Sequence, residues 1–387
     1  MRYSLLSRDC GRRIAPEEYF RRNIMVIRSL KLKNFRNYSE ETFEFSDGVN
    51  IISGANAQGK TSCAEAIFYL CTGYSPRAGR DKQLILAGAD KGFVEGEAVS
   101  AFGKINVNIA FFRDKNKEIK INGVPVAKIG ELLGNVNSVF FNPAELKLIQ
   151  EAPEDRRRFL DISLSQMSSK YFYALQKYKK VLTQRNNLLK EKDREMVFET
   201  LPVWDVSLAG AGARVICERN AYIAKLAPYA KEAHYLITGG AEEMTVSGDY
   251  KYEGEEGEIY DQLIAALKER LEKDYELGYT TVGPHRDDLK IRVNGIDVRT
   301  YGSQGQQRTC ALSLKLAETE IFKERFGEYP VLILDDAYSE LDKSRRENLM
   351  TAAEKMQTII TCTEPDCVPS HELYNNIKIR NGNIIKE

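Results

Sequence analysis

The residues best suited to chemistry form a glycine-rich loop in the first sixth of the chain. Gly54, Gly59, Lys60 and Thr61 match the pattern G-x-x-x-x-G-K-[ST], and the loop lies between a predicted strand and a predicted helix, which is the context of a P-loop. Glycines let the backbone N–H groups face a triphosphate, and the positive end of the following helix adds to the attraction. Lys60 would reach the β- and γ-phosphates, and the Thr61 hydroxyl would ligate Mg²⁺. We predict that the nucleotide is contacted by Gly54, Ala55, Asn56, Ala57, Gln58, Gly59, Lys60, Thr61 and Ser62.

A carboxylate pair at the end of an apolar run is the second candidate. The run 331–334 reads as a buried strand, and Asp335 and Asp336 follow it directly. Beside a P-loop, the first carboxylate can hold Mg²⁺ and the second can polarise the attacking water. We therefore predict Lys60, Asp335 and Asp336 as catalytic residues, with Thr61 and Asp335 as the metal ligands. Many P-loop proteins of this class have Glu at the second position, so the shorter Asp336 predicts slow hydrolysis.

A small polar loop opens a predicted helix shortly before the carboxylate pair. It consists of Ser303, Gln304, Gly305, Gln306 and Gln307. A helix start of this composition can bind an anion, although an ordinary helix cap has the same sequence. In its place between the P-loop and the carboxylate pair, the loop resembles the signature of ABC-type ATPases. This resemblance implies contact with the γ-phosphate of a nucleotide on a partner subunit.

The pattern of apolar residues divides the chain into segments. Strands are predicted over 26–35, 42–46, 49–52 and 104–112, a helix over 61–70 and a hairpin over 117–126, so this part is rich in sheet. The basic stretch 154–191 contains a long helix with heptad-like spacing at Tyr171, Leu175, Tyr178, Leu182 and Leu189. A helical stretch over 207–237 and a helix over 259–275 follow, and together they indicate a helical block. Sheet character returns in the last part of the chain, where hairpins are predicted over 288–299 and 377–385 and strands over 331–334 and 358–361. Helices are predicted between them, over 307–326 and 343–356. We predict an α/β head split into 25–150 and 277–387, with a helical second domain inserted over 151–276.

Composition excludes several classes of protein. The 387 residues are 43% hydrophobic and 29% charged, with 56 basic and 56 acidic residues, so the chain is an ordinary globular protein and any nucleic-acid binding must use local patches. Seven scattered cysteines without a C-x-x-C pair favour a reducing compartment. No apolar run is long enough for a membrane span. Residues 1–24 are rich in Arg and lack a signal-peptide core, so we expect an extension before a natural start at Met25.

Six stretches together resemble the RecF family of DNA replication and repair proteins, relatives of the SMC and ABC ATPases. They are 31–38 (KLKNFRNY), 54–61 (GANAQGKT), 153–161 (PEDRRRFLD), 283–289 (GPHRDDL), 301–309 (YGSQGQQRT) and 334–342 (LDDAYSELD). The resemblance extends from Met25 to the end of the chain. It implies the split ATPase head of the ABC and SMC type.

The resemblance also implies a function. Such proteins bind duplex or gapped DNA when loaded with ATP and Mg²⁺, dimerise around two ATP molecules and assist recombinase loading with RecO- and RecR-type mediators. Slow, DNA-stimulated hydrolysis then releases them. Carried over by position, Arg36 and Asn56 lie near the nucleotide, Ser303 acts on the partner's ATP, and Ser339 and Asp342 lie in a dimer loop. We expect a cytoplasmic, nucleoid-associated protein.

Basic residues supply candidates for DNA contacts, although a solvated charged face has the same appearance. They are Arg77, Arg80, Lys82, Arg156, Arg157, Lys177 and Lys180, with Arg158, Lys179 and Arg185 beside them. His285 and Arg286 are expected to be interior hydrogen-bonding groups. In the segment 143–146, relatives usually have two adjacent acidic residues, and this chain has only Glu145. After the 358–361 strand, ABC transporters have a His, and Thr361 or Thr363 would take its place here.

Three other functions remain open. A transporter motor would need a shorter head and a switch His. A chromosome-organising SMC protein would need a long coiled coil and a hinge. A scaffold that binds ATP with negligible turnover is compatible with Asp336.

Overall fold

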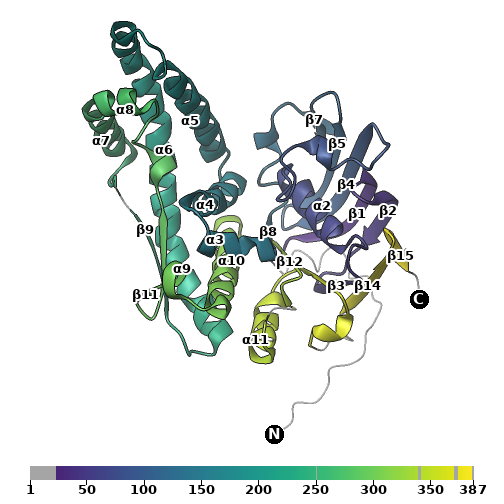
Figure 1. Ribbon diagram of the computed structural model, residues 1–387. Helices are drawn as coiled ribbons and strands as arrows, with labels where there is room; N and C mark the ends of the chain where they lie inside the picture. Colours follow the sequence, from purple (N-terminus) through teal and green to yellow (C-terminus); the bar gives the residue numbers. More distant parts are fainter. Residues whose placement is uncertain (1–22, 250, 339–340, 370–373, 386–387) are drawn as a thin grey trace.

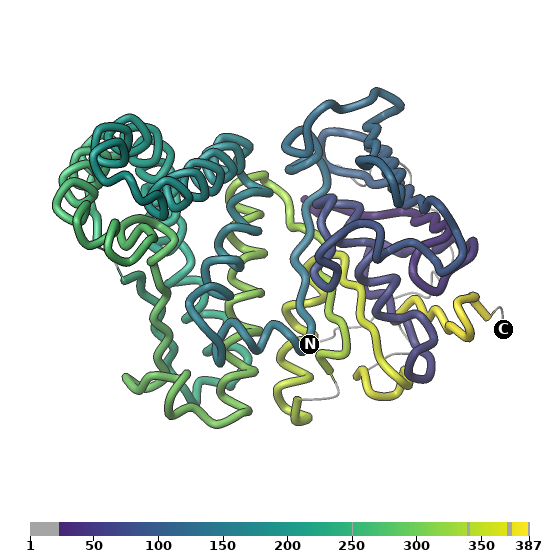
Figure 2. Tube along the Cα trace, turned by 45° about the horizontal axis from the view of Figure 1, so that its top comes forward, coloured from purple at the N-terminus to yellow at the C-terminus, as the bar shows by residue number. Residues whose placement is uncertain are grey.

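The computed structural model describes residues 23–249, 251–338, 341–369 and 374–385. The predicted extension over residues 1–24 therefore lies almost wholly outside the described residues. The described chain forms a lobe rich in sheet beside a lobe made mainly of helices (Figure 1). In Figure 2 the purple and yellow ends of the chain share the sheet-rich lobe, and the teal and green middle forms the helical lobe.

The sheet-rich lobe is built on a six-stranded sheet with the order β15-β14-β3-β13-β12-β8. Its strands are β3 (Val49–Ser53), β8 (Ser138–Phe141), β12 (Val331–Asp335), β13 (Thr358–Cys362), β14 (Asn375–Arg380) and β15 (Asn383–Ile385). All neighbours pair in parallel except β14 and β15. The strands β3, β8, β12 and β13 are buried along their whole length, which explains their continuous apolar sequences.

A second six-stranded sheet is antiparallel, with the order β2-β1-β4-β5-β6-β7. Its strands are β1 (Val26–Phe35), β2 (Tyr38–Glu44), β4 (Lys91–Ser100), β5 (Gly103–Phe112), β6 (Glu118–Ile121) and β7 (Val124–Val126). Helix α2 (Lys60–Thr72) shares one apolar core with both sheets. At Gly96 of β4, a Cβ atom would lie 2.3 Å from Leu70 Cδ2, so the glycine lets the helix approach the strand closely.

The helical lobe surrounds one very long helix, α6 (Arg194–Thr238). Its other helices are α3 (Lys147–Gln150), α4 (Pro153–Met167), α5 (Ser169–Leu188), α7 (Glu256–Glu269), α8 (Leu271–Leu277), α9 (Val298–Tyr301) and α10 (Gln304–Phe326). A small sheet with the order β11-β10-β9 completes it, made of β9 (Met244–Gly248), β10 (Leu289–Val293) and β11 (Ile296–Asp297). Helix α11 (Lys343–Ala353) meets this lobe, because Asn348 Nδ2 donates to the Ile237 carbonyl of α6 at 3.2 Å.

Short 3-10 turns connect several of these elements. They are η1 (Asp81–Gln83), η2 (Ile129–Glu131), η3 (Pro143–Leu146), η4 (Pro284–Arg286) and η6 (Pro365–Cys367).

The predicted long helix with heptad-like spacing is confirmed as α5, and a separate helix, α4, precedes it. The chain breaks at Ser168, which has extended backbone angles between α4 and α5. The Ser168 hydroxyl accepts a hydrogen bond from Tyr171 N at 3.1 Å, so it caps α5 in the manner that serine favours. The strands β4 and β9 are additions that the pattern of apolar residues did not predict.

The predicted boundary between residues 276 and 277 does not separate two packed units. Strand β9 comes from the predicted insert and β10 from the predicted second half of the head, yet they pair with Val246 opposite Ile291. Residues of α10 and α6 also belong to the same apolar core. The helical lobe therefore continues beyond the predicted insert, because the hairpin over 288–299 pairs with β9.

Candidate nucleotide site

The predicted P-loop joins the end of β3 to the start of α2. Gly54 has φ +153° and Gly59 has φ +120°, angles that L-residues with a side chain rarely adopt. A Cβ atom at Gly54 would lie 2.4 Å from the Ile379 carbonyl oxygen, and one at Gly59 would lie 2.6 Å from the Tyr38 hydroxyl. Both glycines are therefore required by backbone geometry and by close neighbours.

The Lys60 side chain folds over the loop that precedes it. Its Nζ donates to the carbonyl oxygens of Gly54 at 2.7 Å and Ala55 at 3.0 Å. The side chain is almost fully buried. An ammonium held in this position can exchange the two carbonyls for phosphate oxygens, which is the function expected of a P-loop lysine.

Two distant segments support the loop from outside. The Tyr38 hydroxyl donates to the Gly59 carbonyl at 2.9 Å, and Asn37 Nδ2 donates to the Gln58 carbonyl at 3.2 Å. From the β14–β15 hairpin, Gly382 N donates to the same Gln58 carbonyl at 3.0 Å and Asn381 N donates to Gln58 Oε1 at 2.6 Å. Sequence reasoning did not assign Asn37, Tyr38, Asn381 or Gly382 to the site. The N-F-R-N-Y stretch of the family resemblance held the signal for the first two.

The structure brings the P-loop and the first predicted carboxylate together. Strand β13 lies between β3 and β12, and the parallel pairing places the ends of all three strands at one edge of the sheet. Thr61 lies near enough to Asp335 to lower the pKa of that carboxyl. The Thr361 hydroxyl donates to Asp335 Oδ1 at 2.7 Å and accepts from Asp336 N at 3.0 Å.

Burial raises the pKa of Asp335, and the neighbouring Asp336 raises it further, whereas the hydrogen bond from Thr361 and the nearby Thr61 oppose the shift. The ionised carboxylate is thus poorly solvated in the absence of a cation.

The donor set at this edge suits Mg²⁺. One carboxylate and one hydroxyl are hard oxygen donors, and Mg²⁺ is commonly held by one or two carboxylates together with phosphates and water. Within the described residues, no three His, Cys, Asp or Glu side chains gather to hold a metal on their own. Thr61 and Asp335 would therefore share the ion with the phosphates of the nucleotide.

Arg36, predicted to lie near the nucleotide, is held by Glu65 of α2. Its Nε and Nη2 donate to the two Glu65 carboxylate oxygens at 2.9 and 2.7 Å. Glu65 is fully buried and also accepts from the Ser75 hydroxyl at 2.5 Å. Arg36 thus ties the β1–β2 turn to the P-loop helix, and its contact with nucleotide stays a prediction.

The Ser303–Gln307 loop begins α10 in the helical lobe. The Ser303 hydroxyl accepts from Gln306 N at 3.2 Å, and Gln306 Oε1 accepts from Ser303 N at 3.0 Å, which is a capping box. Gln306 Nε2 also donates to Glu242 at 3.0 Å, and Gln307 accepts from Gln150 at 2.8 Å. These contacts lie within the helical lobe, whereas α2 and the P-loop belong to the sheet-rich lobe (Figure 1).

The predicted dimer loop is described only in part. Ser339 lies outside the described residues. Asp342 is the N-cap of α11 and accepts from Arg345 N at 3.0 Å. The Arg345 guanidinium pairs with Asp342 at 3.5 Å, and a Cβ atom at Gly305 would lie 3.2 Å from its Nη1. Arg345 therefore links the dimer loop to the loop that begins α10.

The basic residues predicted to contact DNA differ in exposure. Arg77, Arg80, Lys82, Lys177 and Lys180 are exposed. Arg77 also approaches Glu65 at 3.7 Å.

The prediction for Arg156 is wrong. The side chain is buried, its Nε and Nη2 donate to Asp288 at 2.6 and 3.1 Å, and its Nη1 donates to the Leu148 and Glu151 carbonyls. Arg157 is half-buried and donates to the Asp287 carbonyl at 2.7 Å. The neighbouring candidate Arg185 is fully buried and pairs with Asp205 at 2.6 Å and Asp274 at 2.7 Å.

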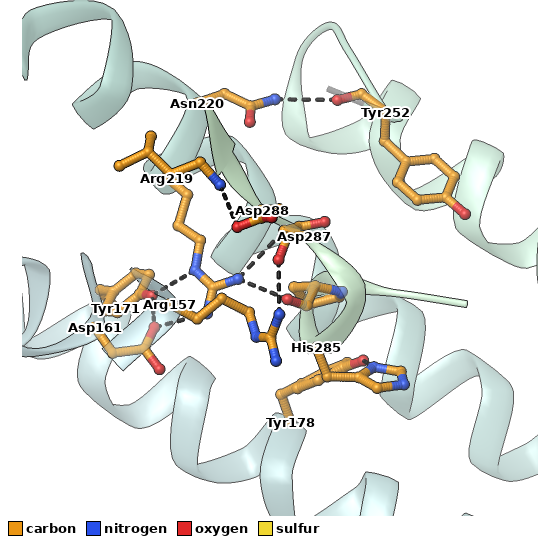
Figure 3. Close-up of polar contacts among 12 residues, drawn as sticks. Arg157, Asp161, Tyr171, Tyr178, Arg219, Asn220, Tyr252, His285, Asp287 and Asp288 are labelled. Atoms are coloured by element: carbon orange, nitrogen blue, oxygen red, sulfur yellow. Dashed lines mark hydrogen bonds and ion pairs between the residues drawn. The ribbon is translucent and has the colours of Figure 1, made fainter. Parts of the chain in front are cut away.

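Two of the family-like stretches, 153–161 and 283–289, meet at the buried Arg219 of α6 (Figure 3). Arg219 donates to Asp161 at 2.7 Å, to the Pro284 carbonyl at 2.7 Å and to Asp287 at 3.2 Å. The Tyr171 hydroxyl donates to Asp161 at 2.5 Å. Arg219 was not predicted as a site residue, and its network holds α4, α5, α6 and η4 together.

His285 is a hydrogen-bonding group, as predicted, but it is half-buried rather than interior. Its Nε2 lies 3.0 Å from the Thr280 carbonyl, which can only accept, so Nδ1 accepts from the Tyr178 hydroxyl at 2.6 Å. Burial lowers the pKa of His285 to about 4. Arg286 is exposed, so the prediction of an interior position is wrong for this residue, although it donates to the Thr280 carbonyl at 3.1 Å.

A cleft of about 790 Å³ opens beside α4 and α5, opposite the Thr72–Tyr74 segment. Its basic lining residues are Lys117, Arg157, Arg158, Lys179 and Arg219, and its acidic ones are Glu154 and Asp161. Cations therefore outnumber anions in this cleft, although the chain as a whole is neutral.

Among the described residues, each helix is too short or too polar to cross a lipid bilayer.

Comparisons with known proteins show the family of this chain. A family model described as "RecF/RecN/SMC N terminal domain" matches residues 26–386. The DNA replication and repair protein RecF of Alkaliphilus oremlandii is 42% identical over 88% of this chain and 93% of its own length. The RecF protein of Acetivibrio thermocellus is 42% identical over 92% of this chain and 98% of its own length.

Solved structures are similar over the same extent. One described as "Structure of the recombination mediator protein RecF-ATPrS in RecFOR pathway" has a TM-score of 0.86 and 36% identity, and the match covers 94% of this chain and 98% of that one. An SMC head domain from Pyrococcus furiosus, bound to the C-terminal domain of ScpA, has a TM-score of 0.55 and 18% identity over 94% of this chain and 96% of that one. The latter shows the common ATPase-head fold only.

Proposed function

The chain belongs to the RecF family of DNA replication and repair proteins, and from this premise we propose that it is an ATP-dependent DNA clamp. Two copies close around two ATP molecules, hold duplex or gapped DNA and separate after slow hydrolysis. The observation that carries this proposal is the division of the site between lobes. The P-loop and Asp335 meet at one sheet edge, whereas the Ser303 loop begins α10 in the other lobe.

In this proposal, a second copy of the chain brings the start of its α10 to the nucleotide bound by the first copy. The first turn of α10 has free N–H groups and a positive dipole end, and both suit the γ-phosphate of a nucleotide on the partner. Arg345, which pairs with Asp342, lies beside Gly305 in the same chain. Closure of two copies would thus bring the Ser303 loop and the dimer loop to the partner's nucleotide together.

Each residue of the hydrolytic site has a defined task in this proposal. Lys60 binds the β- and γ-phosphates, and Thr61 with Asp335 holds Mg²⁺, which neutralises phosphate charge when bound. Asp336 orients the attacking water. Its backbone has φ +51°, and its short side chain supports slow turnover.

DNA binding is proposed to use backbone contacts to exposed basic residues. Arg80, Lys82, Lys177 and Lys180 are exposed, and basic residues outnumber acidic ones in the lining of the cleft beside α4 and α5. Contacts of this kind are independent of sequence and weaken as salt rises.

The proposed partners follow from relatives. A similar structure is described as a recombination mediator of the RecFOR pathway, so we place this chain with RecO- and RecR-type mediators in recombinase loading. The corresponding location is the cytoplasm, on the nucleoid.

Sedimentation tests the clamp directly. The full chain is measured with ATP, with ADP and without nucleotide, each with and without a gapped duplex. A dimer that forms only with ATP and is strengthened by DNA supports the proposal. A monomer under every condition overturns it and favours a nucleotide-binding scaffold.

A Lys60→Met variant serves as the matched control for nucleotide dependence. It should lose the ATP-dependent retention of DNA. Unchanged ATP-dependent retention in this variant contradicts the clamp.

A further inference from the structure

The cleft beside α4 and α5 has an apolar wall that is partly open to solvent. Its volume is about 790 Å³, within the range of pockets that bind drug-sized ligands. The apolar side chains of this wall come from η2 and the turn after it, from α4 and from α5, and each of them is half-buried. They are Ile129, Leu133, Ile162, Phe172 and Leu182. An apolar surface of this kind commonly marks a binding site.

Phe172 is an aromatic part of this wall, and its neighbours hold it in place. It lies where α5 meets η2, because a Cβ atom at Gly130 would lie 3.1 Å from Phe172 Cδ1 and 2.7 Å from the Tyr173 hydroxyl. The rings of Phe172 and Tyr173 are also in contact, with centroids 5.4 Å apart at an angle of 69°. An aromatic ring held beside an apolar cleft can stack on another flat ring.

Two consecutive arginines of α4 bring positive charge to the same cleft. Arg157 Nη1 donates to the Asp287 carbonyl at 2.7 Å, and Arg158 Nη2 donates to the Tyr74 hydroxyl. In the described part of the chain, neither guanidinium forms an ion pair with a carboxylate. Burial lowers the pKa of Arg157, and the nearby Arg219 cation lowers it further (Figure 3). An anion in the cleft would oppose the second effect, so the cleft is complementary to a ligand with negative charge.

The Arg158 guanidinium also lies over the Tyr74 ring, 5.4 Å from its centroid. Tyr74 is 41% exposed and lies shortly after α2, the helix that begins at the P-loop. The pair therefore presents two planar groups at the edge of the cleft. Guanidinium planes and aromatic rings are the surfaces on which proteins stack unpaired bases.

We propose that this cleft binds an unpaired nucleotide of gapped DNA, with its base against Phe172 and the apolar wall and its phosphate at Arg157 and Arg158. This role rests on the DNA binding proposed above and names the feature of DNA that the cleft selects. It does not depend on dimerisation.

A paired base cannot occupy this position. In a duplex the flat faces of the bases are stacked on each other, and only the backbone and the base edges are accessible to a protein. A base in a gap has no pairing partner, so it leaves the stack at a lower cost and can place its face against an apolar wall. The cations would also attract an acidic peptide, but the planar groups at Phe172 and Arg158 favour a base.

The experiment measures binding of the full chain with ATP to two DNAs. One is a continuous duplex, and the other has the same sequence with a short gap whose unpaired strand carries aminopurine, a fluorescent adenine analogue. Wild-type protein should bind the gapped DNA more tightly and should quench the aminopurine, because its base stacks on Phe172. Phe172→Ala should weaken binding to the gapped DNA by about fivefold or more, as expected for the loss of one stacked base, and should bind the duplex as the wild type does.

Two further variants separate this role from an effect on folding. Tyr173→Ala is the matched control, because Tyr173 is next to Phe172, is 38% exposed and does not line the cleft. It should keep the preference for gapped DNA. Gln176 is exposed and lines the cleft, so the isosteric Gln176→Glu places a negative charge there without removing a packing contact. It should weaken binding to the gapped DNA more than binding to the duplex.

Equal affinity of the wild type for the two DNAs would overturn the inference, and so would a Phe172→Ala variant that keeps both the preference and the quenching. If Phe172→Ala and Gln176→Glu instead lose binding to a mediator protein and keep the preference for gapped DNA, the cleft is a protein-docking site and the inference is equally overturned. Wild-type protein that binds neither DNA in the presence of ATP would contradict the proposed function.

Discussion

The hydroxyl of Thr361 donates a 2.7 Å hydrogen bond to the carboxylate of Asp335, and the same hydroxyl oxygen accepts the N–H of Asp336 at 3.0 Å. One β-strand side chain thus orients both residues of the carboxylate pair. Thr361 is fully buried at the end of β13, between the strands that lead to the P-loop and to Asp335.

Replacing Thr361 with Val should impair hydrolysis more than nucleotide binding. The variant keeps the side-chain volume but leaves a buried carboxylate without its donor. We expect the free energy of unfolding to fall by about 1.5–3 kcal/mol, the usual contribution of a hydrogen bond to a charged group. Urea denaturation and steady-state phosphate release measure the two effects. Thr361→Ser retains the hydroxyl and should behave almost as the wild type, and equal defects in both variants would contradict this role.

Replacing Asp335 with Asn should stabilise the protein without nucleotide while abolishing hydrolysis. Burial raises the pKa of Asp335, so the ionised form destabilises the folded state above that pKa, and the penalty disappears as pH falls below it. Asn removes the charge and still accepts from Thr361. Melting should shift upward by roughly 2–4 °C for each 1 kcal/mol gained, the scaling for domains of 150–250 residues. A lower melting temperature at pH 7.5 would show that the carboxylate is stabilising.

Stability should depend on pH through His285. Its pKa is lowered to about 4 in the folded protein, whereas an unfolded histidine titrates near 6.5. Between these values the unfolded chain binds the extra proton, so the free energy of unfolding rises with pH by up to about 1.4 kcal/mol per unit. The contribution of neutral His285 to the free energy of unfolding is complete above the pKa of unfolded histidine and is lost as pH falls toward 4.

Urea titrations at several pH values measure this slope in the wild type and in His285→Gln. The variant should have the smaller slope between pH 4.5 and 6, because glutamine does not titrate. Asp287, whose pKa is raised mainly by burial, is present in both proteins and cancels in the comparison. Identical slopes would mean that His285 does not titrate as described.

Replacing Ser303 with Arg should prevent ATP-dependent dimerisation and leave ATP binding to the monomer intact. The Arg side chain would obstruct the start of α10 that the partner's γ-phosphate is proposed to reach. Loss of the cap on Gln306 N should also cost about 1 kcal/mol of stability. Sedimentation with ATP and a binding assay with a fluorescent nucleotide separate the effects. Ser303→Thr keeps the cap and should dimerise, and normal dimers of the Arg variant would refute the proposed contact.

Local sequence patterns predicted the parts of the site that are contiguous in the chain. The P-loop is readable because glycine spacing and the strand-to-helix context are local signals, and Asp335 is readable because a buried strand precedes it. The P-loop and Asp335 come to the same sheet edge because β3 and β12 both pair in parallel with β13. Thr361 was one of two candidates for the position of the transporter His, but its hydrogen bonds to the carboxylate pair were not predicted.

Charged residues were harder to place because their partners lie far along the chain. The sequence PEDRRRFLD has the composition of a surface helix, yet Arg156 pairs with Asp288 from a distant strand end. Arg219 is one arginine in a long helix, and only the folded structure reveals its contact with Asp161. The separate helix α4 before Ser168 was not predicted, although serine is a common cap.

The hairpin that supports Gln58 has a consequence for protein synthesis. Strand β14 pairs with β3, and Asn381 and Gly382 bind the P-loop at Gln58. Every sequence motif of the ATP site has been translated by the time the ribosome reaches residue 343, but these supports have not. A nascent chain, or one cut short by a late nonsense codon, therefore carries every motif of an ATPase, while its P-loop lacks the hydrogen bonds that Asn381 and Gly382 make with Gln58.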